Sequence, residues 1–397
     1  MSPASIPPSA TAAQRNPAAL SLTPRSAASF TLYACALFIV LGVVTTLLGP
    51  TLPLLAVRWS LSTVQQASLF FWQFVPSTIG TLLSGALLAR RSFRFAVVLG
   101  VSLCLLGVAA LIWSNWNLGR LAIACYGVGL GIALPVLNLA VAEANRTRRA
   151  ASVSLLNFSW GIGAICGPVL LRLAHSLELF FTLLSTFVAL GLLASLFWEM
   201  PGRDTCASAD TGKSAPSKRL WMLVPLFAFS MFIFCGVENA VAGWAATFAL
   251  PSFSDAFKAT NANEAFWAFF LAGRALAPFV LRRLSEASLL RASILTSAVG
   301  VLAFYFASHP VTILVACAVA GLGIGPGFPL LISRVSESIG SQHSACTVCF
   351  AFAGIGAAIL PAMVGIMGEK LHEPRLGLLI PLVGLSVLLP LSRWRSA

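Results

Sequence analysis

The sequence predicts an all-α integral membrane protein with twelve transmembrane helices in two pseudo-symmetric six-helix halves. The first observation is composition: 58% of the 397 residues are hydrophobic and only 9% are charged, whereas a soluble domain carries about 25% charge. The second is that apolar stretches recur along the whole chain, each long enough to cross ~30 Å of hydrocarbon as a helix. The third is one pattern that the chain contains twice.

The repeated pattern has three glycines at alternate positions, then a proline and a glutamate. The first copy consists of Gly127, Gly129, Gly131, Pro135 and Glu143. The second copy, displaced by 194 positions, consists of Gly321, Gly323, Gly325, Pro329 and Glu337. A further glycine group ending at Pro168 recurs 193 positions later, ending at Pro361. Two homologous halves in so apolar a chain are typical of a secondary transporter whose binding site lies between them.

The apolar stretches predict six spans in each half. In the first half, residues 29–198, we expect them at Phe30–Val57, Val64–Ala89, Phe95–Trp113, Leu118–Ala144, Ala150–Leu173 and Leu177–Trp198. In the second half, residues 220–397, we expect them at Leu220–Leu250, Glu264–Leu281, Leu289–Ala307, Val311–Ser336, Ala345–Gly368 and Gly377–Leu391. Residues 1–28, rich in Pro, Ala and Ser, predict a disordered cytoplasmic N-terminus. The polar stretch 199–219 predicts a cytoplasmic linker between the halves.

The distribution of Lys and Arg predicts the orientation. With a cytoplasmic N-terminus, the inner segments hold eighteen of these residues and the outer segments six. This bias indicates a multi-pass protein of the plasma (inner) membrane with both termini in the cytoplasm. The net charge of +13 therefore reflects topology beside anionic lipid, and no nucleic-acid partner is expected.

Metal and enzyme sites are not expected. The nine cysteines lie mostly within spans, as small packing residues do, and Cys346 with Cys349 has no second ligand pair. No nucleophile–base pair appears in or beside the spans. We therefore expect no cofactor, no catalytic residue and no enzyme.

Polar side chains at membrane depth are costly and are functional candidates. At 1.5 Å per residue, Glu238 lies ~15–20 Å from the outer end of its span and Arg274 ~15 Å from the outer end of the next span. One interpretation is a structural ion pair. The other is a pair at the solute cavity, in which Glu238 accepts a hydrogen bond from a hydroxyl or carries the coupled proton.

Amides and indoles supply the other candidate binding groups. An amide presents both donor and acceptor, which suits a neutral polyhydroxylated solute, and an indole offers a flat surface for the apolar face of a sugar. The alternative for the amides is an interhelical hydrogen bond. The candidates are Gln73, Asn138, Asn157 and Asn239 with Trp160, Trp244 and Trp267.

Glycine and proline residues predict that the fourth and tenth spans can bend or be interrupted. They free backbone groups and permit bending where a helix lines a cavity, or they only let helices pack closely. Both functions are compatible. The candidate gating residues are Gly127, Gly131, Pro135, Gly321, Gly325, Pro326 and Pro329.

Specific residues resemble the major facilitator superfamily. Gly85, Arg90, Arg91 and Arg94 are similar to its cytoplasmic loop motif, with Ala89 where an Asp is usual. Further stretches resemble its fucose permease and glucose/galactose transporter branch: Leu52-Pro53, Gly131 to Asn138, Leu156 to Ala164, Gly236 to Glu238, Gly243-Trp244, Phe266-Trp267 and Gly273-Arg274. The resemblance implies that superfamily's twelve-helix fold and a transport function.

One departure concerns coupling. The resemblance implies an acid in the first span and another in the fourth that handle the proton, but Gly49 and Leu134 stand at those positions. The proton route of that branch is therefore not carried over.

The leading hypothesis is a carrier that transports a small neutral polar solute by rocker-switch alternating access, and the solute that the sequence favours is a monosaccharide. Its expected partners are that solute, the lipid bilayer and, where transport is coupled, H⁺ or Na⁺; a monomer is expected. One alternative is efflux of amphipathic compounds. Another, from a different class, is a membrane receptor or scaffold that binds without transport.

Overall fold

The computed structural model describes residues 23–201, 218–339 and 343–392, and the regular structure in these ranges is helical, with no strand. Most of the expected disordered N-terminus (1–28) and of the expected linker (199–219) lies outside the described residues. The side chains of Glu337 and Cys346 also lie outside the described part of the chain.

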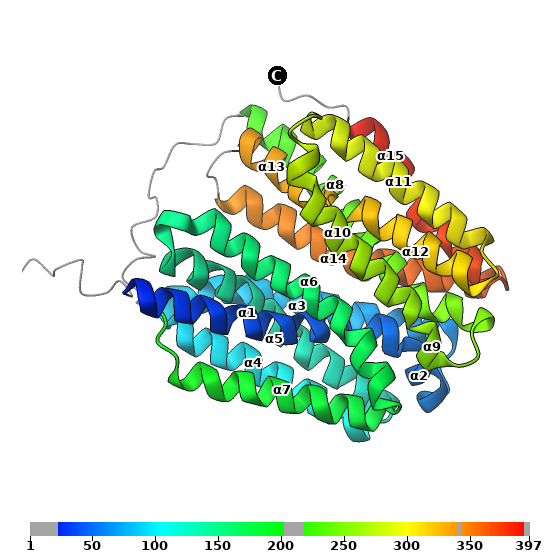
Figure 1. Cartoon of the computed structure of the whole chain (residues 1–397), viewed down its shortest axis with the longest axis horizontal. Coiled ribbons are helices and arrows are strands. Elements are labelled where there is room, and N and C mark those ends of the chain that lie inside the picture. Colours follow the sequence, from blue (N-terminus) through cyan, green and yellow to red (C-terminus); the bar gives the residue numbers. More distant parts are fainter. Residues whose placement is uncertain (1–22, 202–217, 340–342, 393–397) are drawn as a thin grey trace, which may run out of the picture.

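The first half contains α1 to α7 (Figure 1). The helices are α1 (Pro24–Thr46), α2 (Leu48–Trp59), α3 (Thr63–Arg90), α4 (Phe93–Ala110), α5 (Trp116–Ala144), α6 (Arg149–Ala174) and α7 (Leu177–Phe197). Short 3₁₀ turns at Leu111–Trp113 and Arg146–Arg148 join some of them. Each of the six predicted spans corresponds to one helix or, for the first, to the pair α1 and α2.

The second half contains α8 to α15. The helices are α8 (Lys218–Ala249), α9 (Ala256–Ala259), α10 (Asn261–Val280), α11 (Glu286–Phe306), α12 (Pro310–Ile324), α13 (Gly327–Ile339), α14 (His343–Lys370) and α15 (Leu379–Leu391). Further 3₁₀ turns lie at Leu250–Ser252 and Pro374–Leu378. The tenth predicted span is the pair α12 and α13, and α9 is a single turn between spans.

Ten helical segments of the described chain are long and apolar enough to cross a membrane. The long helices α3 and α10 complete the bundle but are more polar, carrying Gln73 and Arg274 at mid-length. Both pack against the other half of the chain, α3 on α14 and α10 on α6. Helices that line an interior site are more polar than helices that face lipid on most sides.

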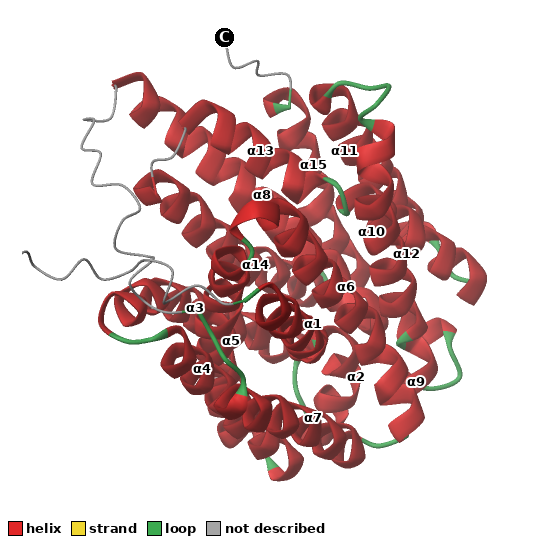
Figure 2. Cartoon of the chain, turned by 60° about the vertical axis from the view of Figure 1, so that its left-hand side comes forward, coloured by secondary structure: helices red, strands yellow, loops and turns green. Residues whose placement is uncertain are grey.

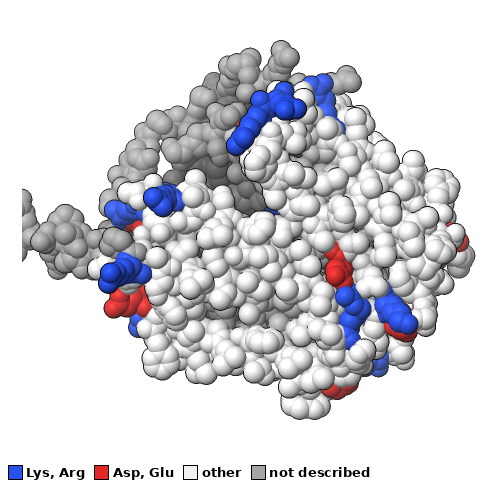
Figure 3. All heavy atoms as spheres, viewed as in Figure 1, with Lys and Arg blue, Asp and Glu red and all other residues white. Residues whose placement is uncertain are grey.

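The outer surface of the bundle is apolar between its two ends. Leu32, Leu106 and Phe306 are each more than 60% exposed, which in a membrane protein means contact with lipid. Figure 3 shows Lys, Arg, Asp and Glu near the two ends of the visible face, with a broad uncharged band between them. This band has the character of a surface that spans hydrocarbon.

The internal repeat is also a repeat of contacts. A Cβ on Gly127 of α5 would meet the Gln73 carbonyl of α3, and a Cβ on Gly321 of α12 would meet the Phe266 carbonyl of α10. Gln73 and Phe266 are themselves 193 positions apart. Gly131 and Gly325, one turn further along, likewise lie against backbone carbonyls of α3 and α10. In the other helix pairs, Gly163 of α6 lies against a carbonyl of α1, and Gly356 of α14 lies against a carbonyl of α8. The glycines therefore allow close helix packing in both halves.

Prolines interrupt two of the spans. Pro50, four residues after Thr46, has no N–H for the Thr46 carbonyl, and α1 ends at Thr46. Pro326 and Pro329 act similarly in the tenth span, where α12 ends at Ile324 and α13 starts at Gly327. The bending expected of the tenth span is present there, whereas α5 runs continuously through Pro135.

Among the described residues, the two halves touch mainly through α3 with α14, α2 with α8, and α6 with α10, and α9 adds smaller contacts with α2 and α6. Figures 1 and 2 show the two bundles side by side, with the α1–α7 bundle next to α8–α15. We call the end of the bundle where α1 starts and α15 ends the terminal end, and the other the distal end. At the distal end, Arg172 of α6 forms an ion pair with Glu264 of α10 (2.5 Å), and the Val64 N–H donates to Glu369 Oε2 (2.7 Å). The two halves are therefore joined at the distal end, and we call the Arg172–Glu264 ion pair the distal clasp.

Candidate solute-binding site

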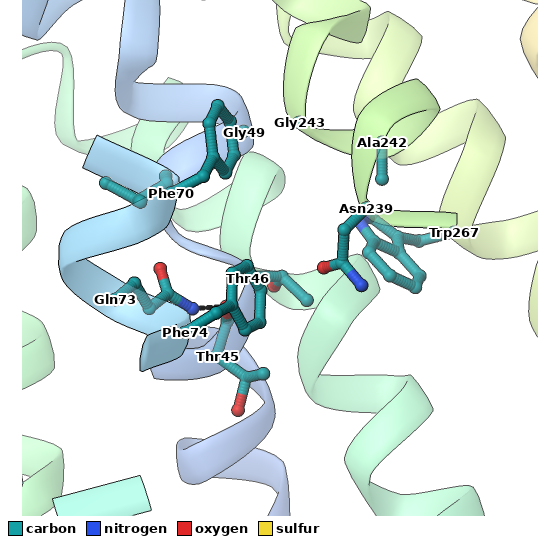
Figure 4. A pocket seen from close by; sticks show the side chains of 11 residues that line it. Thr45, Thr46, Gly49, Phe70, Gln73, Phe74, Asn239, Ala242, Gly243 and Trp267 are labelled. Atoms are coloured by element: carbon teal, nitrogen blue, oxygen red, sulfur yellow. Dashed lines mark hydrogen bonds between the residues drawn. The ribbon is translucent and has the colours of Figure 1, made fainter. Parts of the chain in front are cut away.

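A small pocket lies at mid-length between the two halves, beside the break between α1 and α2. Figure 4 shows its lining converging from α1, α2, α3, α8 and α10. The space open to water-sized molecules is about 20 Å³, enough for one or two waters at ~10–15 Å³ each. The lining residues are Thr45, Thr46, Leu48, Gly49, Phe70, Gln73, Phe74, Asn239, Ala242, Gly243 and Trp267. In this state of the protein the site is contracted around solvent-sized space.

Gln73 is a fully engaged member of this lining. Its Nε2 donates to the Thr45 carbonyl (2.7 Å; Figure 4) and its Oε1 accepts from the Tyr126 hydroxyl (3.0 Å). The side chain is 1% exposed. Gln73 thus ties α1, α3 and α5 together behind the pocket and orients the helix that carries Thr45.

Two indoles meet across the boundary between the halves. Trp160 of α6 and Trp267 of α10 are in edge contact, with ring centroids 5.6 Å apart and planes at 87°. Trp160 Nε1 donates to Thr45 Oγ1 (3.3 Å), next to the pocket. The structure therefore brings two of the three expected indoles to the junction of the halves, and Trp267 lines the pocket.

Trp244 lies elsewhere. It is completely buried and its Nε1 donates to the Pro361 carbonyl of α14 (2.9 Å). Because Pro361 lies inside α14, this bond joins α8 to α14 within the second half. The structure places Trp244 in the core, one ring behind the pocket residue Phe70, and outside the pocket lining.

Glu238 and Arg274 are close but are not in direct contact. The two groups interact electrostatically, yet no ion pair within 4.0 Å joins them in the described chain. Arg274 Nε donates to the Gly325 carbonyl instead (3.0 Å), and its guanidinium lies 4.3 Å from the Phe270 ring centroid. Glu238 is 8% exposed. A contact ion pair, one of the two interpretations of these residues, is therefore not what the structure contains.

Asn239 follows Glu238 and reaches the pocket. Figure 4 shows its amide extending from α8 toward Thr46. Its Nδ2 donates to the Cys235 carbonyl one turn earlier (2.9 Å). This bond uses one of two donors and leaves the amide oxygen for a solute.

Asn138 and Asn157 are brought together by the packing of α5 against α6. Asn157 Nδ2 donates to Asn138 Oδ1 (2.8 Å) and to the Val153 carbonyl (2.8 Å). Asn157 is exposed and lies one turn from Trp160. An exposed amide at this depth is favourable only where it faces water or a solute and not lipid.

Sequence reasoning missed two threonines and two aromatic rings of the lining. Thr45 and Thr46 end α1 directly before the break, and Phe70 and Phe74 flank Gln73 on α3. The available signal was the pair of prolines after Thr46, since a broken helix at membrane depth points to a binding site. No sequence feature separates Phe70 and Phe74 from the other phenylalanines.

The loop motif lies at the terminal end, away from the pocket. Arg94 donates to the Trp198 carbonyl (2.9 Å), which ties the start of α4 to the end of α7. Arg91 lies over the Phe95 ring (5.4 Å). Gly85 faces open space, since a Cβ on this residue would have no neighbouring atom within 4 Å, and Arg90 is the last residue of α3.

Comparison with known proteins identifies a transporter family. The model of the Major Facilitator Superfamily matches residues 34–361. The glucose/mannose transporter GlcP of Bacillus subtilis is 22% identical over 349 residues, which cover 84% of this chain and 86% of the relative. The human sodium-dependent glucose transporter 1 is 22% identical over 380 residues, covering 85% and 73% of the two chains.

Solved structures of this family share the fold. The Escherichia coli fucose:proton symporter aligns over 94% of this chain and 100% of its own, with a TM-score of 0.63 and 18% identity. The E. coli xylose transporter, in a partially occluded inward-open conformation, aligns over 92% and 98% with a TM-score of 0.74 and 16% identity. The expected all-α membrane fold is the fold of these structures, and the expected count of twelve transmembrane helices is consistent with it.

Proposed function

Because the chain belongs to the Major Facilitator Superfamily, and is a membrane transporter and not an enzyme, we propose that it carries a monosaccharide by alternating access. The observation that carries this proposal is the lining of the pocket between the halves. This lining combines the neutral amide of Asn239 and the hydroxyl groups of Thr45 and Thr46 with the indole of Trp267. No Lys, Arg, Asp or Glu belongs to the pocket lining.

This chemistry fits a neutral polyhydroxylated solute. Hydroxyl groups pair with amide and hydroxyl groups, and the apolar C–H face of a pyranose packs on an aromatic ring. Asn157 and Asn138, one turn nearer the terminal end, would extend the polar track that the solute follows. The glucose and mannose named for the related transporters agree with this solute class.

The contracted pocket supports alternating access. A monosaccharide does not fit in 20 Å³, so the solute enters only when the halves move apart. The clasp of Arg172 with Glu264 closes the distal end, and rocking about the Trp160–Trp267 junction would open it. With the terminal end in the cytoplasm of the cell, this is the state closed to the outside.

Coupling, where present, would pass through Glu238. The resemblance to the fucose permease branch implies acids where Gly49 and Leu134 stand, and Gly49 packs directly against Asn263 and Ala242. Glu238 is adjacent in sequence to the lining residue Asn239 and lies on the same helix, α8. We therefore assign proton binding to Glu238, with a monomer as the transporting unit.

The test is counterflow in proteoliposomes with labelled fucose, glucose, galactose and mannose against their unlabelled forms. Counterflow requires no knowledge of the coupling ion, so it isolates the solute class. We expect accumulation of one of these sugars, lost in Trp267→Leu and kept in Trp113→Leu, because Trp113 is 81% exposed. Folded protein that accumulates none of the four overturns the monosaccharide proposal and favours efflux of a more apolar compound.

A further inference from the structure

The break in the tenth span leaves one backbone carbonyl without its helical donor. In an α-helix the carbonyl of Gly325 would accept from the N–H of residue 329, but Pro329 has none. Gly325 is the C-cap residue of α12, which ends at Ile324, and α13 begins two residues after Gly325. A buried carbonyl in this position requires another donor.

Arg274 supplies that donor. Its Nε lies 3.0 Å from the Gly325 oxygen. Close approach is possible because Gly273 has no side chain: a Cβ there would lie 3.2 Å from Pro326 Cδ. The guanidinium also lies over the Phe270 ring (4.3 Å) and 5.9 Å from the Trp160 ring centroid. Arg274 thus links the break in the second half to an indole of the first half.

Glu238 is the second group within the electrostatic reach of Arg274. No hydrogen bond to its carboxylate joins it to the described chain, although the side chain is only 8% exposed. Cys235, one turn earlier on α8, is the other titratable neighbour. On the segments packed against α8, the other charged side chains that the structure describes lie towards helix ends or in short turns: Arg58 on α2, Lys258 on α9, Glu264 on α10, Arg334 on α13, Glu369 and Lys370 on α14, and Arg375 in the 3₁₀ turn Pro374–Leu378.

The first half carries the same proline without the cation. Pro135 lies four residues after Gly131 and likewise has no N–H for its carbonyl. Thr81, 193 positions before Arg274, occupies the corresponding place on α3, and its hydroxyl donates to the Ser77 carbonyl within its own helix. There α5 stays continuous. Of the two corresponding spans in the described chain, the tenth therefore combines a break with a cation and a neighbouring acid, whereas the fourth has neither the break nor the cation.

We propose that Arg274 is a switching residue, shared between the Gly325 carbonyl at the α12–α13 break and the Glu238 carboxylate. When Glu238 is ionised it attracts the guanidinium and the break loses its donor. When Glu238 is protonated, Arg274 keeps its hydrogen bond to the Gly325 carbonyl and fixes the bent span. Proton binding at Glu238 is thereby converted into a change in the shape of a helix that contacts α10. This inference rests on the assignment of Glu238 as the proton-binding group.

The first test is a double-mutant cycle read by thermal unfolding of the detergent-solubilised protein, without any solute. Pro329→Ala supplies the missing N–H to Gly325, and Pro329→Ser does the same if the alanine variant is unstable. We expect Arg274→Gln to lower the Tm by roughly 1–3 °C less in the Pro329→Ala background than in the wild type, because the carbonyl then has its own donor. Equal losses in both backgrounds would overturn the link between Arg274 and Gly325.

The second test is the pH profile of proton-coupled uptake of whichever solute shows counterflow. In Pro329→Ala, Arg274 is released from Gly325 and pairs with ionised Glu238, so protonation requires more acid. We expect the profile to move by about one pH unit to lower pH, with no shift in the matched variant Pro135→Ala. If the pH profile does not move, or if it moves equally in both variants, the proposed exchange of Arg274 between Gly325 and Glu238 is contradicted. The double-mutant cycle of thermal unfolding uses no solute, so its result does not depend on the monosaccharide proposal. A failure of the monosaccharide proposal would be seen separately, in the counterflow experiment.

Discussion

Asn157 on α6 donates a hydrogen bond of 2.8 Å to the amide oxygen of Asn138 on α5. The two amides come from successive spans of the first half and lie one turn or more beyond the Trp160 indole toward the terminal end. Each also donates to a carbonyl of its own helix, Val153 for Asn157 and Leu134 for Asn138. The pair is thus held by both helices, yet Asn157 stays exposed, as the proposed role in solute binding requires.

Asn157→Ala is expected to weaken sugar counterflow while preserving the fold. Loss of one solute hydrogen bond costs about 1 kcal/mol, so the half-saturating sugar concentration should rise roughly 5- to 10-fold. The measurement is counterflow at graded sugar concentrations, with Tm as the test of folding. Asn145→Ala is the matched control, since Asn145 makes a similar interhelical bond to Thr31 (2.9 Å) far from the pocket. Equal effects of the two substitutions would reduce Asn157 to a packing role.

Glu238→Gln is expected to abolish uptake driven by a proton gradient. The amide has the shape of the carboxylic acid but binds no proton, so cycles that need its deprotonation stop while the fold survives. Uptake is measured with an imposed pH gradient, and the control is Glu143→Gln, because Glu143 forms an ion pair with Arg146 at the edge of the bundle. Unchanged gradient-driven uptake in Glu238→Gln would remove this residue from coupling.

The sequence determined the architecture well because two physical signals are strong in membrane proteins. Apolar length predicted segments that are helices in the structure, ten of which are long and apolar enough to cross a membrane in the described chain, and the glycine repeat recurs as a repeat of helix contacts. The first span, expected at Phe30–Val57, appears as α1 and α2 because Pro50 interrupts it. That interruption could have been predicted from the proline rule alone, and its position beside the pocket is what gives it functional meaning.

The site was predicted less completely because membrane depth does not say which way a side chain points. Glu238, Asn239 and Trp244 lie within two turns of one helix, yet only Asn239 lines the pocket and Trp244 is buried against α14. Arg274 was expected to meet Glu238, but the carbonyl freed by Pro329 attracts it instead. Such partners depend on the three-dimensional packing of α10 against α12 and are not encoded in spacing along the chain.

Gly131→Ala and Gly325→Ala are each expected to destabilise the protein. An added Cβ would collide with the Ser77 carbonyl in one case and the Phe270 carbonyl in the other, and overpacking of this kind costs about 1–3 kcal/mol. Both variants should therefore lose several degrees of Tm and yield less folded protein. Gly85→Ala serves as the control because its Cβ would face open space. A Tm unchanged from wild type in either test variant would mean that the helices can separate freely, and that close packing is not the function of the repeat.

The distal clasp provides a test of the direction in which the halves open. Arg172→Glu places two carboxylates together at the junction of α6 and α10, so the closed distal end becomes unfavourable and sugar counterflow should fall several-fold. Because the pair is partly exposed, the effect on the equilibrium between states is modest, about 1 kcal/mol. The charge-swapped variant Arg172→Glu with Glu264→Arg should restore counterflow. The control is Arg58→Glu with its partner Glu178 (3.2 Å), an ion pair at the same end but within the first half. Repulsion there leaves the junction of the halves untouched, so a loss of counterflow as large as that of Arg172→Glu would show that general destabilisation, and not opening of the distal end, explains the result.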